Sequence, residues 1–95
     1  MKDAEKYRFE VLAELSKAED AMQRAGAALD KLHAQRAAFA EDQWACSLPH
    51  AHIAVAAIQS EFTDRIAAAE MSYGQCVVLV YRLRLRQQRY SRDDR

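Results

Sequence analysis

The chain is poor in the residues that interrupt regular structure. Its 95 residues include only two glycines and one proline. An all-β domain needs many more such residues, because each connection between strands requires special backbone angles. The scarcity excludes an all-β fold and is typical of a protein built from long helices.

Cysteines, long apolar runs and net charge are also scarce. The two cysteines, Cys46 and Cys76, have no CxxC spacing, so we expect free thiols in a reducing compartment and no intrachain disulfide. The longest apolar run, residues 76–81, is far shorter than the roughly 18 residues that a membrane span needs. Residues 1–10 are charged throughout, so we expect no signal peptide. We therefore expect a cytoplasmic protein, and its alanine and arginine content indicates a bacterial source.

One strong interruption, CSLPH at residues 46–50, divides the chain. Ser47 is placed to cap a helix whose first turn contains Pro49, where the missing N–H has no cost. We predict one domain over residues 1–95, with a helix over about 2–44, a turn over about 45–48 and a second helix over about 48–91. Two long helices joined by so short a turn must run antiparallel.

Both predicted helices carry a heptad repeat of apolar residues, which we call the inner seam. In the first helix it comprises Val11, Leu15, Ala18, Met22, Ala25, Leu29, Leu32 and Phe39, with Arg36 as an interruption. In the second helix it comprises Val55, Phe62, Ile66, Ala69, Tyr73, Cys76, Val80 and Leu83. Alternating spacings of three and four are typical of coiled coils. The sequence thus predicts an all-α, coiled-coil-like antiparallel two-helix hairpin, completed to a bundle by self-association or by a partner.

Two pairings of the helices satisfy this pattern. A register centred near residues 45–46 places large residues opposite small ones in three successive layers, as close-packed helices require: Ala18 with Tyr73, Met22 with Ala69, and Ala25 with Ile66. It also pairs Leu29 with Phe62. A register shifted by one heptad, centred near Pro49, fits as well. The sequence does not choose between them.

The second helix also carries apolar residues off its seam. They are Val77, Val78, Leu79, Tyr81 and Leu85. A two-helix hairpin cannot bury all of them, and a helix that is apolar on several sides is normally covered on several sides. We predict that this end of the chain contacts another protein or a second copy of itself, with a dimer as the expected assembly.

Basic residues surround these apolar positions. Residues 76–95 carry a net charge of +4, whereas the whole chain is neutral. The arginines are Arg82, Arg84, Arg86, Arg89, Arg92 and Arg95. We predict that Arg82, Arg86 and Arg89 orient a partner through charge complementarity. Binding of nucleic acid by this basic helix is the alternative, and a plain solvated helix end is the third interpretation. Trp44, near the turn, is either a cap on the end of the bundle or an exposed anchor for a partner.

Other candidate sites are weaker. Cys46, His50 and His52 are potential zinc ligands, but their spacing fits no closed zinc site, so we expect no metal, no cofactor and no small-molecule substrate. Arg36, on the inner seam, would pair with Glu61 or Asp64, extend to solvent, or bind a ligand. The stretch LDKLHAQRAAFA, residues 29–40, resembles the arginine-bearing helix of small all-α chorismate mutases. The lysine expected beyond that arginine is absent from residues 37–47, so we predict no such activity.

No catalytic motif is visible, and we predict a protein that is not an enzyme. Its expected role is that of a protein-protein interaction module, such as an adaptor, chaperone, inhibitor or assembly factor. In shape, the predicted hairpin is similar to the export-gate stalk proteins of flagellar and type III secretion systems. A secretion or mobile-element system is therefore a possible setting, on architecture alone.

Overall fold

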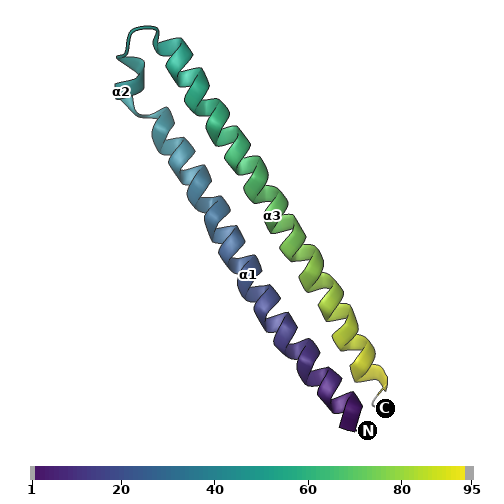
Figure 1. The fold of residues 1–95 in the computed structure, drawn as a ribbon. Coiled ribbons are helices and arrows are strands. Elements are labelled where there is room, and N and C mark those ends of the chain that lie inside the picture. Colours follow the sequence, from purple (N-terminus) through teal and green to yellow (C-terminus); the bar gives the residue numbers. More distant parts are fainter. Residues whose placement is uncertain (1, 94–95) are drawn as a thin grey trace.

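A computed structural model describes residues 2–93 of the chain, with side chains described for residues 5–89. The chain forms α1 (Lys2–Ala40), α2 (Gln43–Cys46) and α3 (Ala51–Asp93). The two long helices pack side by side and run antiparallel, so that the start of α1 and the end of α3 lie at the same end of the molecule (Figure 1). The prediction of an all-α antiparallel hairpin is confirmed.

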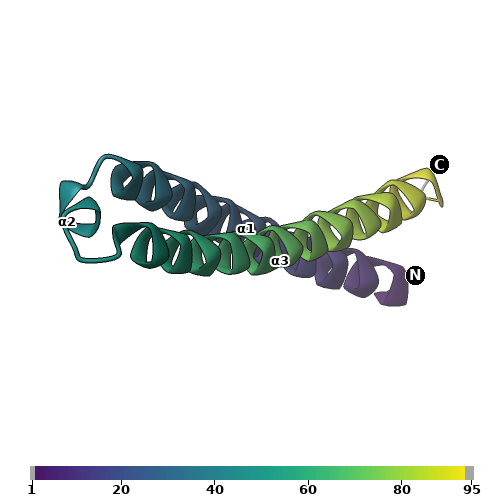
Figure 2. The same ribbon diagram turned by 90° about the horizontal axis from the view of Figure 1, so that it is seen from above.

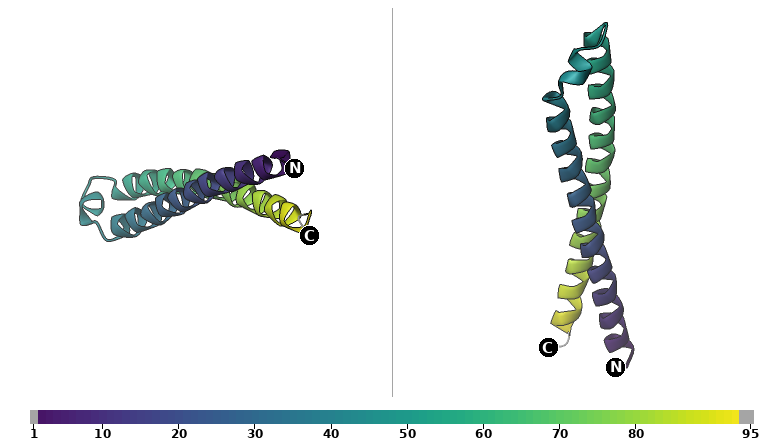
Figure 3. Two further views of the ribbon diagram at one scale, coloured as in Figure 1. Left: turned by 90° about the horizontal axis from the view of Figure 1, so that it is seen from below. Right: turned by 90° about the vertical axis from the view of Figure 1, so that its left-hand side faces the viewer.

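The molecule is a rod with extents of 72 × 16 × 14 Å. At a rise of 1.5 Å per residue, α3 alone spans about 65 Å, so the length of one helix sets the length of the rod. The two long helices cross each other along the rod, as Figures 2 and 3 show. Such a crossing is expected when the side chains of one helix pack into the spaces of the other. Within residues 2–93, no helical stretch is long and apolar enough to cross a bilayer.

The connection between the long helices starts earlier than predicted. α1 ends at Ala40 instead of near residue 44. Two residues later, Asp42 adopts an extended conformation (φ −74°, ψ 121°), and its Oδ1 accepts the backbone N–H of Trp44 at 2.9 Å. An aspartate that binds a nearby backbone N–H in this way competes with helix continuation. Asp42 therefore caps the short α2 instead of prolonging α1.

The connection also ends later than predicted, because Ser47 does not cap the second long helix. Ser47 ends α2, and Pro49 lies in the turn before α3 and not in its first helical turn. α3 begins at Ala51, after His50, whose φ of 56° lies in the left-handed region. The connection thus spans residues 41–50 and contains a helical turn of its own.

The tightest packing lies in the half of the hairpin far from the turn. Leu15 and Ala18 of α1 form a buried cluster with Val80 and Leu83 of α3, and Met22 packs against it. These four buried residues pair as the register centred near Pro49 requires. The other buried apolar residues among those described are Val11, Ala45 and Ile66.

Two further contacts confirm this register. The ring centroids of Phe39 and Phe62 are 6.0 Å apart, whereas the alternative placed Leu29 opposite Phe62. A Cβ atom added to Gly26 would lie 3.4 Å from Cε2 of Tyr73, whereas the alternative placed Ala18 there. The register centred near residues 45–46 is therefore wrong. In the observed register α2 packs against α3 at the turn end of the rod (Figure 1), and α1 pairs with α3 beyond it.

Candidate interaction surface

The five apolar residues predicted to lie off the inner seam are exposed in the hairpin. Val77, Val78, Leu79, Tyr81 and Leu85 have exposed fractions between 38% and 62%. All five lie on the half of α3 that packs against the first half of α1. The hairpin therefore leaves them available for contact, as the sequence predicted.

Three of these residues belong to a second heptad pattern on α3, which we call the outer seam. It comprises Met71, Gly74, Val78, Tyr81 and Leu85, again at alternating spacings of three and four. With 3.6 residues per turn, these positions lie roughly opposite the inner seam of the same helix. A helix with two opposed heptad seams can pack against two different neighbours. α1 covers the inner seam and leaves the outer seam uncovered.

A hollow of about 520 Å³ lies on the outer seam at Gly74. Its lining consists of Met71, Gly74, Gln75, Val78, Leu79 and Arg82. A Cβ atom added at Gly74 would meet nothing within 4 Å, so the glycine itself opens the space. The hollow is therefore part of the helix surface and needs no rearrangement to accept a side chain.

A second hollow, of about 290 Å³, lies along the interface between the two long helices, which we call the joint. Its lining consists of Glu14, Lys17, Ala18, Ala21, Leu79 and Leu83. Leu79 lines both hollows and so connects the outer seam with the joint. The apolar surface is thus continuous around one flank of the hairpin, and Val77 lies on the other flank of α3.

The arginines of this region have different environments. Arg84 of α3 forms an ion pair with Glu19 of α1, with 3.3 Å between Nη2 and Oε1. Arg82, Arg86 and Arg89 are exposed and make no ion pair with any residue whose side chain is described. These three are the arginines predicted to orient a partner. Arg92 and Arg95 lie outside the residues with described side chains.

Trp44 lies away from the other predicted contact residues. It belongs to α2, at the turn end of the rod (Figure 1), and its side chain is 63% exposed. The small Ala45 is the fully buried residue there, so Trp44 does not cap the bundle. The tryptophan could serve as a separate anchor, but it cannot join a single patch with the outer seam.

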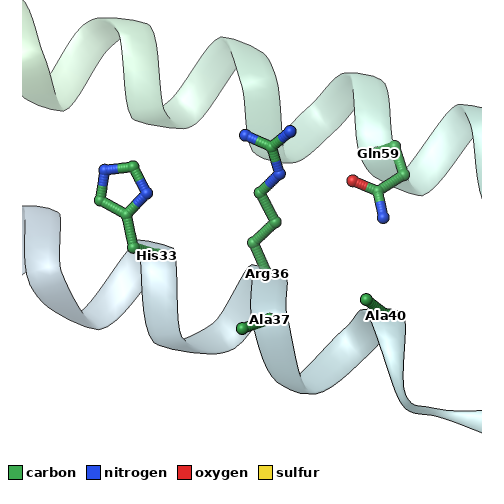
Figure 4. A pocket seen from close by; sticks show the side chains of 5 residues that line it. All are labelled: His33, Arg36, Ala37, Ala40 and Gln59. Carbon is green, nitrogen blue, oxygen red and sulfur yellow. The ribbon is translucent and has the colours of Figure 1, made fainter.

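Arg36 lines a hollow of about 540 Å³ between the long helices, with His33, Ala37, Ala40 and Gln59. Figure 4 shows the guanidinium extending from α1 towards α3, with Gln59 extending from α3. Arg36 is exposed and forms no ion pair with Glu61 or Asp64 among the described contacts. The predicted ion pair is therefore absent among the described residues, and the Arg36 side chain lies exposed in this hollow.

The cysteines and histidines of the turn form no common site among the described residues. Cys46 is exposed, Cys76 is half-buried, and both are free. Within the described part of the chain, no three His, Cys, Asp or Glu side chains are grouped to hold a metal ion.

Sequence reasoning missed two members of the outer seam. Met71 is 69% exposed, more than any of the five predicted apolar residues, and Gly74 forms the hollow. A signal was present, because Met71, Val78 and Leu85 follow one another at intervals of seven residues. Met71 and Gly74 precede the apolar run that begins at Cys76, so that run alone does not reveal them.

Comparison with known proteins gives no relative for this chain. No protein-family model, no curated protein and no solved structure matches it. Its function therefore has to be inferred from the surface described above.

Proposed function

We propose that the chain is a non-enzymatic protein-protein interaction module that binds another polypeptide through the outer seam of α3. The observation that carries this proposal is the continuous apolar surface around Leu79, which joins the hollow at Gly74 to the joint between the helices. Soluble proteins rarely leave large contiguous apolar patches exposed unless a partner covers them. The role that we propose is that of an adaptor, chaperone, inhibitor or assembly factor in the bacterial cytoplasm.

The residues have distinct roles in this proposal. Val78, Leu79 and Leu85 supply apolar area, and Tyr81 adds an aromatic ring of the kind that is common at the centre of interfaces. Arg82 lines the hollow at Gly74 and is exposed, so its guanidinium can meet a carboxylate at the rim of the contact. Such rim charges mainly set orientation and association rate. An apolar segment flanked by acidic residues is the partner chemistry that fits this arrangement.

Nucleic-acid binding is the alternative, because Arg82, Arg86 and Arg89 are all exposed without an ion partner among the described side chains. Phosphate binding releases counterions, so the affinity would fall steeply with salt. It would also depend on the arginines and little on the apolar residues. These two dependences distinguish the alternative from the main proposal.

The test is a pull-down from a nuclease-treated bacterial lysate with the full chain as bait. We compare the chain with Val78→Glu and Leu85→Glu variants, and with Ile53→Glu as the matched control. Ile53 is 61% exposed on the same helix but lies near the turn, outside the outer seam. The proposal expects a polypeptide that Ile53→Glu retains and that both seam variants lose, at low and at high salt. Retention by the seam variants, or loss only with an Arg82→Ala/Arg86→Ala variant, would contradict it.

A further inference from the structure

We infer that a second copy of the chain occupies the outer seam, with the two α3 helices packed antiparallel. This inference rests on the proposed function, because it specifies which polypeptide covers that surface. Three observations carry it: the total accessible surface of the chain, the shape of the outer seam, and the distribution of charge along α3.

The accessible surface of the chain exceeds that of a globular monomer of its size, because the chain is a rod only two helices thick. It amounts to 7688 Å², whereas a typical folded protein of 10.8 kDa exposes about 5,500 Å². The excess of about 2,000 Å² exceeds the roughly 800 Å² that each partner buries in a standard interface, and it is of the size that obligate dimers bury. The surface of one chain is therefore sufficient for a stable dimer.

The outer seam is complementary to its own antiparallel copy. Within the hairpin, the register centred near Pro49 places Leu15 opposite Leu83 and Ala18 opposite Val80, and all four belong to one buried cluster, so each layer takes one residue from each helix in reversed order. Several antiparallel registers of two outer seams satisfy the same rule, and we take the one that brings the largest residue to the glycine. It forms a layer of Val78 with Tyr81 of the second copy. The next layer places Leu85 of the second copy opposite Gly74.

The layer at Gly74 explains the hollow. In a coiled coil, a side chain of one helix enters a hole formed by residues i, i+3, i+4 and i+7 of the other. Met71, Gly74, Gln75 and Val78 have this spacing, and all four line the hollow. Leu85 of the second copy is the side chain that the antiparallel register brings to it. Since the contact is two-fold symmetric, the same layer forms twice.

Charge favours the antiparallel orientation. Arg82, Arg86 and Arg89 all lie towards the end of α3, and a parallel pair would place the two sets beside each other. Like charges that face each other across helices are destabilising. The antiparallel pair separates the two sets and, in this register, places Arg89 of each copy at the level of Glu70 of the other.

The first experiment measures the absolute mass by light scattering after size exclusion over a series of concentrations. The chain is expected at twice its 10.8 kDa mass. A Leu85→Ala variant is expected to raise the dimer dissociation constant at least about tenfold, as truncation of a central contact does. The double variant Gly74→Leu/Leu85→Ala should restore the dimer, because it exchanges the large and the small member of the same layer. Ile53→Ala, outside the seam, should leave the dimer unchanged.

A second experiment tests the orientation by measuring the distance between spin labels. The label is placed on Ser60→Cys in a chain that also carries Cys46→Ser and Cys76→Ala. In the antiparallel register the two labelled positions are about 60 Å apart along the axis, from a rise of 1.5 Å per residue. A parallel pair would place them within about 20 Å, since packed helices lie 8–10 Å apart.

Several results would overturn the inference. The mass experiment would do so if the chain were a monomer at all concentrations, if Leu85→Ala did not weaken the dimer, or if Gly74→Leu/Leu85→Ala formed no tighter dimer than Leu85→Ala. The label experiment would do so if the two labels lay within about 20 Å of each other. A monomer that still captures a polypeptide in the pull-down, in a manner sensitive to Leu85→Glu, would overturn the second copy alone. A dimer whose seam variants change nothing in the pull-down would instead contradict the binding of a different protein.

Discussion

Leu83 and Leu85 provide a direct test of the two seams, because the same residue type occurs twice within one helical turn. Leu83 is 3% exposed and belongs to the buried cluster with Leu15, Ala18 and Val80. Leu85 is 47% exposed and lies on the outer seam. Replacing each leucine with alanine removes the same atoms, so the difference between the variants reports only their surroundings.

The expected magnitudes differ several-fold. A buried leucine replaced by alanine typically costs about 2–5 kcal/mol, part of it for the cavity that remains. The joint between two helices is open at its sides and can partly close, so we expect about 2–3 kcal/mol for Leu83→Ala. Complete burial of a leucine side chain stabilises a fold by about 1.5–3 kcal/mol. Because Leu85 is half-exposed, Leu85→Ala should lower the free energy of unfolding of the isolated hairpin by at most about 1 kcal/mol.

The assay is urea unfolding followed by helical circular dichroism at several protein concentrations. Leu83→Ala should lower the midpoint at every concentration. Leu85→Ala should leave the midpoint nearly unchanged at the lowest concentration and should reduce its rise with concentration, because a stable dimer raises apparent stability by mass action. The assignment of the inner seam would be refuted if, at the lowest concentration, Leu85→Ala lowered the free energy of unfolding as much as Leu83→Ala or more.

Three further predictions concern the register, the ion pair and the turn. A double-mutant cycle on Phe39 and Phe62 should give a coupling of about 0.5–1.5 kcal/mol, as for other aromatic pairs; no measurable coupling would contradict the register. Arg84→Ala should lower the free energy of unfolding by less than about 1 kcal/mol, because its ion pair with Glu19 is solvent-exposed. This loss should be smaller in high salt. The emission of Trp44, the single tryptophan, should be that of a solvent-exposed indole; a blue-shifted spectrum of the monomer would contradict its placement.

The architecture could be predicted because several sequence features agree on it. Scarce glycine and proline, together with two heptad repeats, leave the antiparallel hairpin as the simplest arrangement. The register could not be predicted, because a shift of seven residues preserves every seam position. It depends on the length and path of the connection, which contains α2 with Asp42 as its N-cap.

The turn was misassigned because two local signals competed. Ser47 and Pro49 match the usual start of a helix, but Asp42 had already ended α1, and Ser47 then closed the short helix that followed. His50 adopts a left-handed conformation that favours glycine. A histidine at this position therefore does not indicate a turn in the sequence.

The exposed surface was predicted better than its organisation. Val77, Val78, Leu79, Tyr81 and Leu85 were recognisable because a two-helix hairpin has only one inner side. The intervals of seven residues between Met71, Val78 and Leu85 indicate the second seam in the sequence, but the hollow at Gly74 is visible only in the structure.

The position of the tight core has a consequence for how the hairpin folds. For a flexible chain, forming the Phe39–Phe62 contact first closes a loop of about 23 residues, and forming the Leu15–Leu83 contact first closes one of about 68. The entropy of closure grows only with the logarithm of loop length, so the longer loop costs only about 1 kcal/mol more. Burial of the leucine cluster can offset a difference of that size. Folding of this hairpin therefore need not proceed from the turn outward, and either end of the inner seam can form first.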